Sequence, residues 1–276
     1  MTIVITAVAF ATAIVAALRS TWSPCGLSML STITPIGEHG RGNRYRTTAA
    51  WFVVGAVLGG ATLGASTAAL AAGVHALRLS PAVAGSIAAG ALAIAALSDL
   101  EVGGVHLPGH HRQVNERWLD RFRAWVYGAG FGWQIGTGLG TYIMTAAVYL
   151  LILLGALTAS PAAALVLGSL FGLVRGLCVL LGRRITSPGA LQEFHRRFAE
   201  VGPRARNGVV AVELAACTAI LGALWPPAAL VLGTSALTAA ALVGVRAAAG
   251  RRRAGSSPSD RCQVRPGVSA GATAPR

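Results

Sequence analysis

Apolar residues are concentrated in seven long runs, and short intervals rich in Arg, Gly and Pro separate them. The runs cover residues 2–36, 48–73, 81–98, 125–157, 161–182, 207–224 and 226–246. A helix of about 17 to 25 residues crosses a bilayer, so each run is long enough. Because lipid offers the backbone no hydrogen-bonding partners, such segments form helices unless protein surrounds them. The pattern predicts an all-α polytopic membrane protein with seven crossings.

The composition supports a lipid environment. Of the 276 residues, 54% are hydrophobic and 12% are charged, whereas about 25% of residues are charged in a soluble domain. The net charge of +14 comes from 23 basic residues, all of them Arg. These lie at the ends of apolar runs and not along a binding face, which argues against nucleic acid as a partner.

The distribution of Arg predicts the orientation. Twenty of the 23 Arg residues follow the first, third or fifth run or lie at the end of the seventh run and beyond it, whereas Arg78 alone lies in a loop on the opposite side. By the positive-inside rule, the N-terminus is outside the plasma membrane and the C-terminus is cytoplasmic. Within the fifth loop, Ser187-Pro188 is a helix-start signal, and the residues after it predict an amphipathic helix along the inner surface.

The first and fourth runs are too long for one straight crossing, and each contains helix-weakening residues near its middle. The first break spans residues 23–27 and the second spans 135–139. An offset of 112 aligns Pro24 with Gly136, Cys25 with Thr137 and Gly26 with Gly138. Paired breaks predict two inverted three-helix repeats, a plan in which unwound backbone binds a substrate or ion. The alternative is that these glycines permit close helix packing.

This plan divides the chain into five parts. We expect a first transmembrane repeat at 1–98, a cytoplasmic loop at 99–124, a second repeat at 125–225, an additional transmembrane helix at 226–246 and a disordered basic tail at 247–276.

One motif carries a family resemblance. Residues 22–27 read Trp22-Ser23-Pro24-Cys25-Gly26-Leu27. At the break of a long first segment, this motif resembles the CcdA/DsbD transmembrane family of the wider LysE-type transporter superfamily, over roughly residues 1–225. The resemblance implies a Cys in the first helix and another in the fourth. Together they pass reducing equivalents from cytoplasmic thioredoxin to outward-facing thiol proteins, as in cytochrome c biogenesis.

The chain departs from that family at its second cysteine position, which is Thr137. Thiol–disulfide exchange needs a second thiolate to resolve the mixed disulfide. Cys178 or Cys217 could supply it if the fold brought either one close to Cys25, and both could equally be small packing residues. A role as a thiol–disulfide oxidoreductase therefore depends on a partner for Cys25.

Two charged residues lie inside apolar runs, Arg175 in the fifth and Glu213 in the sixth. Because such charges are costly in a bilayer, we expect a mutual ion pair or a water-lined cavity. With Thr141 and the two breaks, they suggest a rival function, a LysE-superfamily-like transporter of a small solute or ion in which Cys25 only packs.

Other chemistry has little support in the sequence. His106, His110 and His111 form the densest set of candidate metal ligands, but they match no fixed ligand spacing. There is no phosphate-binding glycine loop and no Ser-His-Asp pattern. We expect no metal and no cofactor.

Overall fold

The structure is a computed structural model that describes residues 1–101 and 118–225. These residues belong to one compact unit, Met1–Thr234. The expected seventh helix, the basic tail and the three histidines of the loop lie outside the described residues.

The described chain is helical throughout, without a strand in either described range, and the prediction of an all-α polytopic membrane protein is confirmed. Five helical stretches are long and apolar enough to cross a bilayer: α1 (Thr2–Ser20), α4 (Tyr45–Leu77), α5 (Pro81–Asp99), α9 (Pro161–Leu177) continued by the 3-10 helix η2 (Cys178–Arg184), and α10 (Pro188–Leu224). The shorter helices are α2 (Pro24–Thr32), α3 (Pro35–Gly40), α6 (Trp118–Arg121), α7 (Ala124–Gly136) and α8 (Ala147–Leu157).

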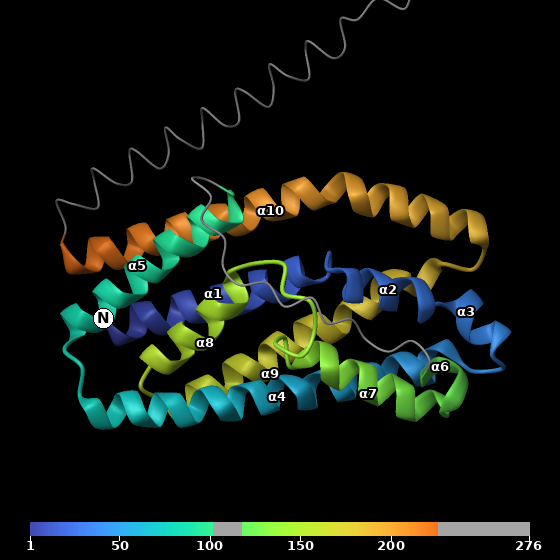
Figure 1. The fold of residues 1–276 in the computed structure, drawn as a ribbon, viewed down its shortest axis with the longest axis horizontal. Helices are drawn as coiled ribbons and strands as arrows, with labels where there is room; N and C mark the ends of the chain where they lie inside the picture. The colour runs from blue at the N-terminus through green and yellow to red at the C-terminus, as the bar shows by residue number, and fades with distance from the viewer. Residues whose placement is uncertain (102–117, 226–276) are drawn as a thin grey trace, which may run out of the picture. The chain divides into compact units, whose positions relative to one another are not determined.

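Both long runs are broken as predicted. The first divides into α1 and α2, and the fourth divides into α7 and α8. Figure 1 shows α1 and α8 at the end of the bundle that holds the N-terminus, and α2 and α7 toward the other end. The broken helices therefore run in opposite directions. Corresponding helices also pack together, since α1 contacts α8, α4 contacts α9 and α5 contacts α10. This is the arrangement expected of inverted repeats.

Glycine faces bring α4 close to α7 and α9. A Cβ atom on Gly59 would overlap the Trp133 carbonyl oxygen of α7, and one on Gly60 would overlap the Gly168 carbonyl oxygen of α9. Because these positions carry no side chains, the helix backbones come into direct contact. In a bilayer, where the hydrophobic effect does not drive helices together, such close packing is a main source of helix association. This packing fixes α7 and α9, which carry much of the candidate site.

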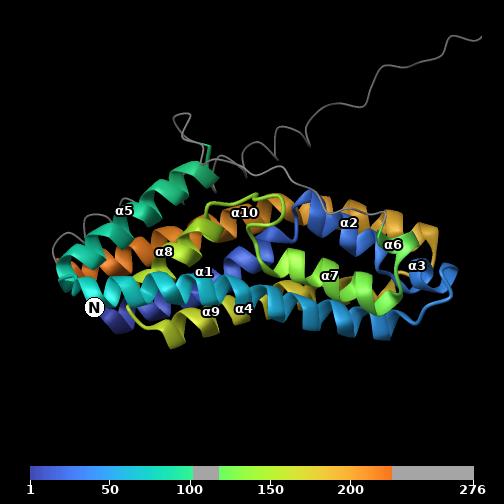
Figure 2. The ribbon, with the colours of Figure 1, turned by 60° about the horizontal axis from the view of Figure 1, so that its bottom comes forward.

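The prediction of a separate amphipathic helix in the fifth loop was wrong. Ser187 does cap a helix, accepting from Ala190 N at 3.2 Å. That helix, however, continues through Pro203 to Leu224 as the single helix α10 (Figures 1 and 2). Its first half contacts the first break, because Trp22 Nε1, in the α1–α2 link, donates to the Phe198 carbonyl at 2.8 Å and the two rings stack.

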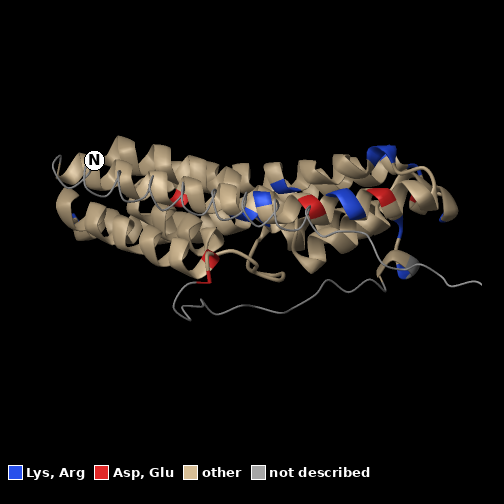
Figure 3. Cartoon of the chain, turned by 90° about the horizontal axis from the view of Figure 1, so that it is seen from above, with Lys and Arg blue, Asp and Glu red and all other residues tan. Residues whose placement is uncertain are grey.

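Charge is distributed unevenly along the bundle. Figure 3 shows most basic side chains of the described residues at the end opposite the N-terminus. The links between α3 and α4, between α6 and α7 and between η2 and α10 lie at that end, so the Arg clusters of three separate loops come together there.

Candidate functional site

The first break places Cys25 in the first turn of α2. Ser23 caps this helix, since its Oγ accepts from Gly26 N at 3.2 Å, and Pro24 begins it with a fixed φ. Gly26 has no room for a side chain, because a Cβ there would overlap the Thr21 carbonyl. Cys25 is 2% exposed. The break therefore buries this thiol at a helix N-terminus and exposes none of it to the surface.

The second break is an irregular segment between Gly136 and Ala147. Gly138 has a φ of +68°, a conformation that a side chain disfavours. Thr137 Oγ1 donates to the Gln134 carbonyl at 2.7 Å and so caps the end of α7. Gly136 packs directly against the Ala56 carbonyl of α4. At this break Gly136 allows close packing against α4 and Gly138 allows the turn. Thr137, which stands where the family has its second cysteine, caps α7 with its hydroxyl.

Arg175 on α9 ties the second break together. Its guanidinium is buried, with 3% of the residue exposed, and donates to the Ile135 carbonyl at 2.8 Å and to Thr141 Oγ1 at 3.3 Å. It also lies 5.7 Å from the centre of the Phe171 ring. Ile135 lies in the last turn of α7, and its carbonyl also accepts from Gly138 N at 3.2 Å, so Arg175 adds a second donor to the backbone at the break.

The expected ion pair between Arg175 and Glu213 is not formed. Arg175 bonds to the second break, and neither carboxylate oxygen of Glu213 has a hydrogen-bond partner. Of the two alternatives expected for these charges, the ion pair was wrong, because the faces of α9 and α10 that carry them do not meet; Arg175 does line a small cavity. Arg175 instead faces α7, and Glu213 lies on a helix that packs against α5 and α1.

Two of the cysteines lie beside Arg175. The Cys25 and Cys178 thiols are both within electrostatic range of its guanidinium. Cys178 begins η2, directly after α9, and its Sγ lies 3.2 Å from Thr21 Oγ1 at the first break. Both helix breaks and both thiols are therefore gathered around one buried cation. In this structure neither cysteine is part of a disulfide.

A small cavity of about 20 Å³ opens at this point. It has room for about one water molecule. Its walls come from both halves of the chain and consist of Thr21, Gly26, Met29, Leu30, Phe52, Ile135, Arg175, Cys178 and Val179. A cavity of this size, beside a buried cation and a thiol, is too small for a solute.

Cys217 lies elsewhere. Its Sγ is 3.5 Å from the Ala89 carbonyl, on the side of α10 that faces α5. The structure thus brings Cys178 to the candidate site and leaves Cys217 against α5. Among the described residues, no three His, Cys, Asp or Glu side chains gather as metal ligands.

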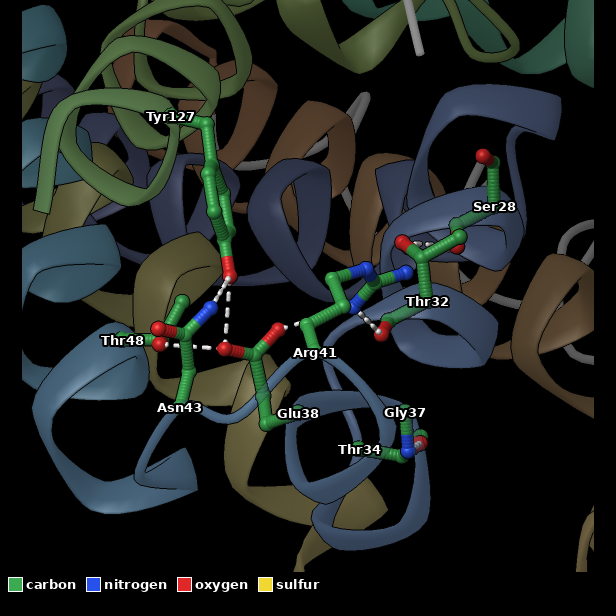
Figure 4. A network of polar contacts seen from close by, with 9 residues as sticks. All are labelled: Ser28, Thr32, Thr34, Gly37, Glu38, Arg41, Asn43, Thr48 and Tyr127. Carbon is green, nitrogen blue, oxygen red and sulfur yellow. Dashed lines mark hydrogen bonds and ion pairs between the residues drawn. The ribbon is translucent and has the colours of Figure 1, made fainter. Parts of the chain in front are cut away.

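Sequence reasoning missed a polar network at the Arg-rich end of the bundle. Figure 4 shows Glu38 of α3, fully buried, with its carboxylate surrounded by donors. Thr48 Oγ1 and Tyr127 Oη each donate to Oε2 at 2.6 Å, and Arg41 Nη1 donates to Oε1 at 3.0 Å. These partners come from α4, α7 and the α3–α4 link. No sequence pattern joins them, because they lie up to 89 residues apart.

Comparison with known proteins gives one group of relatives. Part of the chain is similar to the methylamine utilization protein MauF. The Paracoccus denitrificans protein is 30% identical over 188 residues, which are 63% of this chain and 62% of that protein. The Methylorubrum extorquens protein is 28% identical over 204 residues, 72% of this chain and 70% of that protein. The Methylophilus methylotrophus protein is 27% identical over 203 residues.

The match spans just over three fifths of the length of the two Paracoccus relatives. No family model matches the chain, and no solved structure matches it. The CcdA/DsbD resemblance of residues 22–27 is not confirmed by these comparisons. What they and the fold establish together is a multi-pass membrane protein with MauF-like sequence.

Proposed function

We propose that this protein transfers reducing equivalents across the membrane by thiol–disulfide exchange, as the CcdA/DsbD family does, with Cys25 and Cys178 as its thiol pair. The observation that carries the proposal is the position of both thiols around the buried Arg175 guanidinium, at the junction of the two helix breaks. The thiolate is the reactive form in exchange, and Arg175 offsets part of the cost of burying one at Cys178. Cys178 then takes the role that Thr137 cannot fill.

The proposed relay moves two electrons in two thiol–disulfide exchange steps on each side of the membrane. A thiolate of a cytoplasmic dithiol protein such as thioredoxin attacks the Cys25–Cys178 disulfide and forms a mixed disulfide with one cysteine, while the other leaves as a thiolate beside Arg175. The second thiolate of the donor then attacks the mixed disulfide, so the donor leaves oxidised and the pair is reduced. On the outer side the reduced pair passes its two electrons to the disulfide of an extracytoplasmic protein by the same two steps.

This relay requires the bundle to open, because Cys25 is 2% exposed. The breaks are suited to that movement, since each interrupts a helix. From the relatives' name we infer that the process served is methylamine utilization.

Cross-linking of the two thiols tests the proposal. In membranes treated with a mild oxidant, non-reducing peptide mapping should find a Cys25–Cys178 disulfide. Cys25→Ser should trap a mixed disulfide on Cys178, and Cys178→Ser should trap one on Cys25. Cys217→Ser is the matched control, a membrane cysteine on another helix face, and should leave cross-linking and electron transfer unchanged. If Cys25 and Cys178 never cross-link and their Ser variants keep full activity, the relay does not exist.

The rival function is transport of a small solute or ion by a LysE-superfamily-like mechanism through the broken helices. The observation in its favour is Glu213, which is fully buried with both oxygens unpartnered. Transport predicts that Arg175→Gln and Glu213→Gln abolish uptake or export of the solute, whereas Cys25→Ser does not.

The proposed topology follows from the Arg-rich end of the bundle. We propose that this end faces the cytoplasm, with the N-terminus outside, repeats at 1–98 and 125–225, a cytoplasmic loop at 99–124, an additional crossing at 226–246 and a cytoplasmic tail.

A further inference from the structure

Glu213 is the buried group that the proposed relay leaves unused. It lies on α10, is 0% exposed, and neither of its oxygens has a hydrogen-bond partner. One turn further on, Cys217 bonds to the Ala89 carbonyl of α5, so this side of α10 is packed against α5. A buried carboxylate without a donor is among the most costly groups a membrane protein can hold.

The charged groups around Glu213 do not neutralise it. The titratable group that acts electrostatically on Glu213 is another acid, Asp99, at the end of α5. Arg19, from α1, acts on Asp99 and on Arg206 of α10. Arg206 leaves its own Nε without a partner and makes no ion pair with Glu213. The nearby cation Arg19 therefore acts on Asp99, whereas Glu213 has another acid within electrostatic range and no hydrogen-bond donor.

Asp99 is also attached to the second break. Thr145 Oγ1 donates to Asp99 Oδ2 at 2.5 Å, and Ala146 N donates to Oδ1 at 2.8 Å. The other end of the same segment is held by Arg175, through Ile135 and Thr141. The second break is thus tethered at one end to the cation beside the thiols and at the other to the acid beside Glu213.

We propose that Glu213 binds and releases a proton within the membrane, and that its charge state controls the second break through Asp99. With a proton, Glu213 is neutral and Asp99 keeps its bonds to Thr145 and Ala146. Without it, two carboxylates of adjacent helices repel each other in a poorly hydrated site, and the contact between α5 and the break loosens. In the proposed relay the donor dithiol releases two protons while the Cys25–Cys178 pair takes up two, and Glu213 is a group inside the bundle that can hold a proton in transit between them. In that respect the inference rests on the proposed relay, although proton binding itself does not.

Infrared titration of the full chain in lipid nanodiscs tests proton binding. The wild-type protein should show the C=O stretch of a protonated carboxylic acid at neutral pH, and Glu213→Gln should abolish it. Gln matches the neutral acid in shape, so this variant should fold; Glu213→Asp, which keeps a titratable group, should retain a shifted band. Glu38→Gln is the matched control, because Glu38 is equally buried but is surrounded by Arg41 and two hydroxyls, and it should leave the band in place.

Two outcomes overturn proton binding. One is a wild-type acid band that persists unchanged in Glu213→Gln. The other is an ionised Glu213 whose carboxylate bands respond to sodium at constant pH, which would make it a cation ligand. Cys25→Ser and Cys178→Ser should keep the band, so failure of the relay and failure of this inference give different results.

Labelling tests the coupling to the break. Leu139→Cys, in the break, should react several-fold faster with a membrane-permeant maleimide once the acid band disappears, relative to Leu70→Cys on α4. The same comparison in Glu213→Gln should show no such rise. Equal rates in the two backgrounds would show that the charge of Glu213 does not reach the break.

Discussion

The hydrogen bonds to the buried Glu38 carboxylate are expected to contribute strongly to the stability of the bundle, and a single substitution tests this. Thr48→Val keeps the shape of the side chain and removes one donor at 2.6 Å from a fully buried carboxylate oxygen. Interhelical hydrogen bonds between neutral groups in membranes are worth about 0.6 kcal/mol on average, whereas a bond to a charged group is worth about 1.5–3 kcal/mol. Because Glu38 carries a charge balanced by Arg41 alone, we expect the larger value.

The assay is reversible unfolding in mixed micelles, followed by tryptophan fluorescence. Thr48→Val should lower the free energy of unfolding by about 1.5–3 kcal/mol. Thr62→Val is the control on the same helix, since Thr62 is exposed and bonds to the Gly59 carbonyl of its own helix. It should change stability by less than about 0.5 kcal/mol.

A double variant separates the network from its parts. Tyr127→Phe removes the other hydroxyl donor to the same oxygen of Glu38. With both donors gone, Oε2 has no partner, so the two losses together should exceed the sum of the single losses. A loss of about 0.6 kcal/mol or less for Thr48→Val, equal to that of the control, would refute the view that a buried charge organises this end of the bundle.

Three further predictions follow from the packing and the charge pattern. Gly59→Ala should destabilise the bundle strongly in the same unfolding assay, because its Cβ would overlap a carbonyl of α7. Gly73→Ala on the same helix is the control: its Cβ meets open space, so it should be neutral or stabilising by up to about 1 kcal/mol. Trp22→Phe removes the donor to a carbonyl of α10 and should cost about 1 kcal/mol while preserving much of the ring stacking; an unchanged stability would show that the contact between the first break and α10 does not depend on this bond. In intact cells, Arg78→Cys should react with a membrane-impermeant thiol reagent and Arg44→Cys should not, and the reverse result would invert the proposed topology.

Much of the fold could be predicted from local sequence. The apolar runs are long enough to require the bilayer, and Pro24, Gly136 and Gly138 are disfavoured in a helix interior, so both breaks could be predicted without coordinates. The continuous helix α10 was not predicted, because the change from amphipathic to apolar composition resembles the boundary between a loop helix and a membrane-spanning helix. The helix in fact continues through Pro203.

For the candidate site, the sequence predicts the residues that stand at the breaks and inside the apolar helices, but not which of them come together. The sequence by itself determined that Cys25 lies at a break, that Thr137 replaces the expected second thiol, and that Arg175 and Glu213 are charges within apolar helices, because each of these depends on residue type and neighbours along the chain. Only the tertiary structure decided that Cys178 and not Cys217 lies at the first break, against Thr21, that Arg175 binds the second break, and that Glu213 is within electrostatic range of Asp99. The physical reason is that helix packing selects which faces meet, and backbone contacts at glycines set that choice.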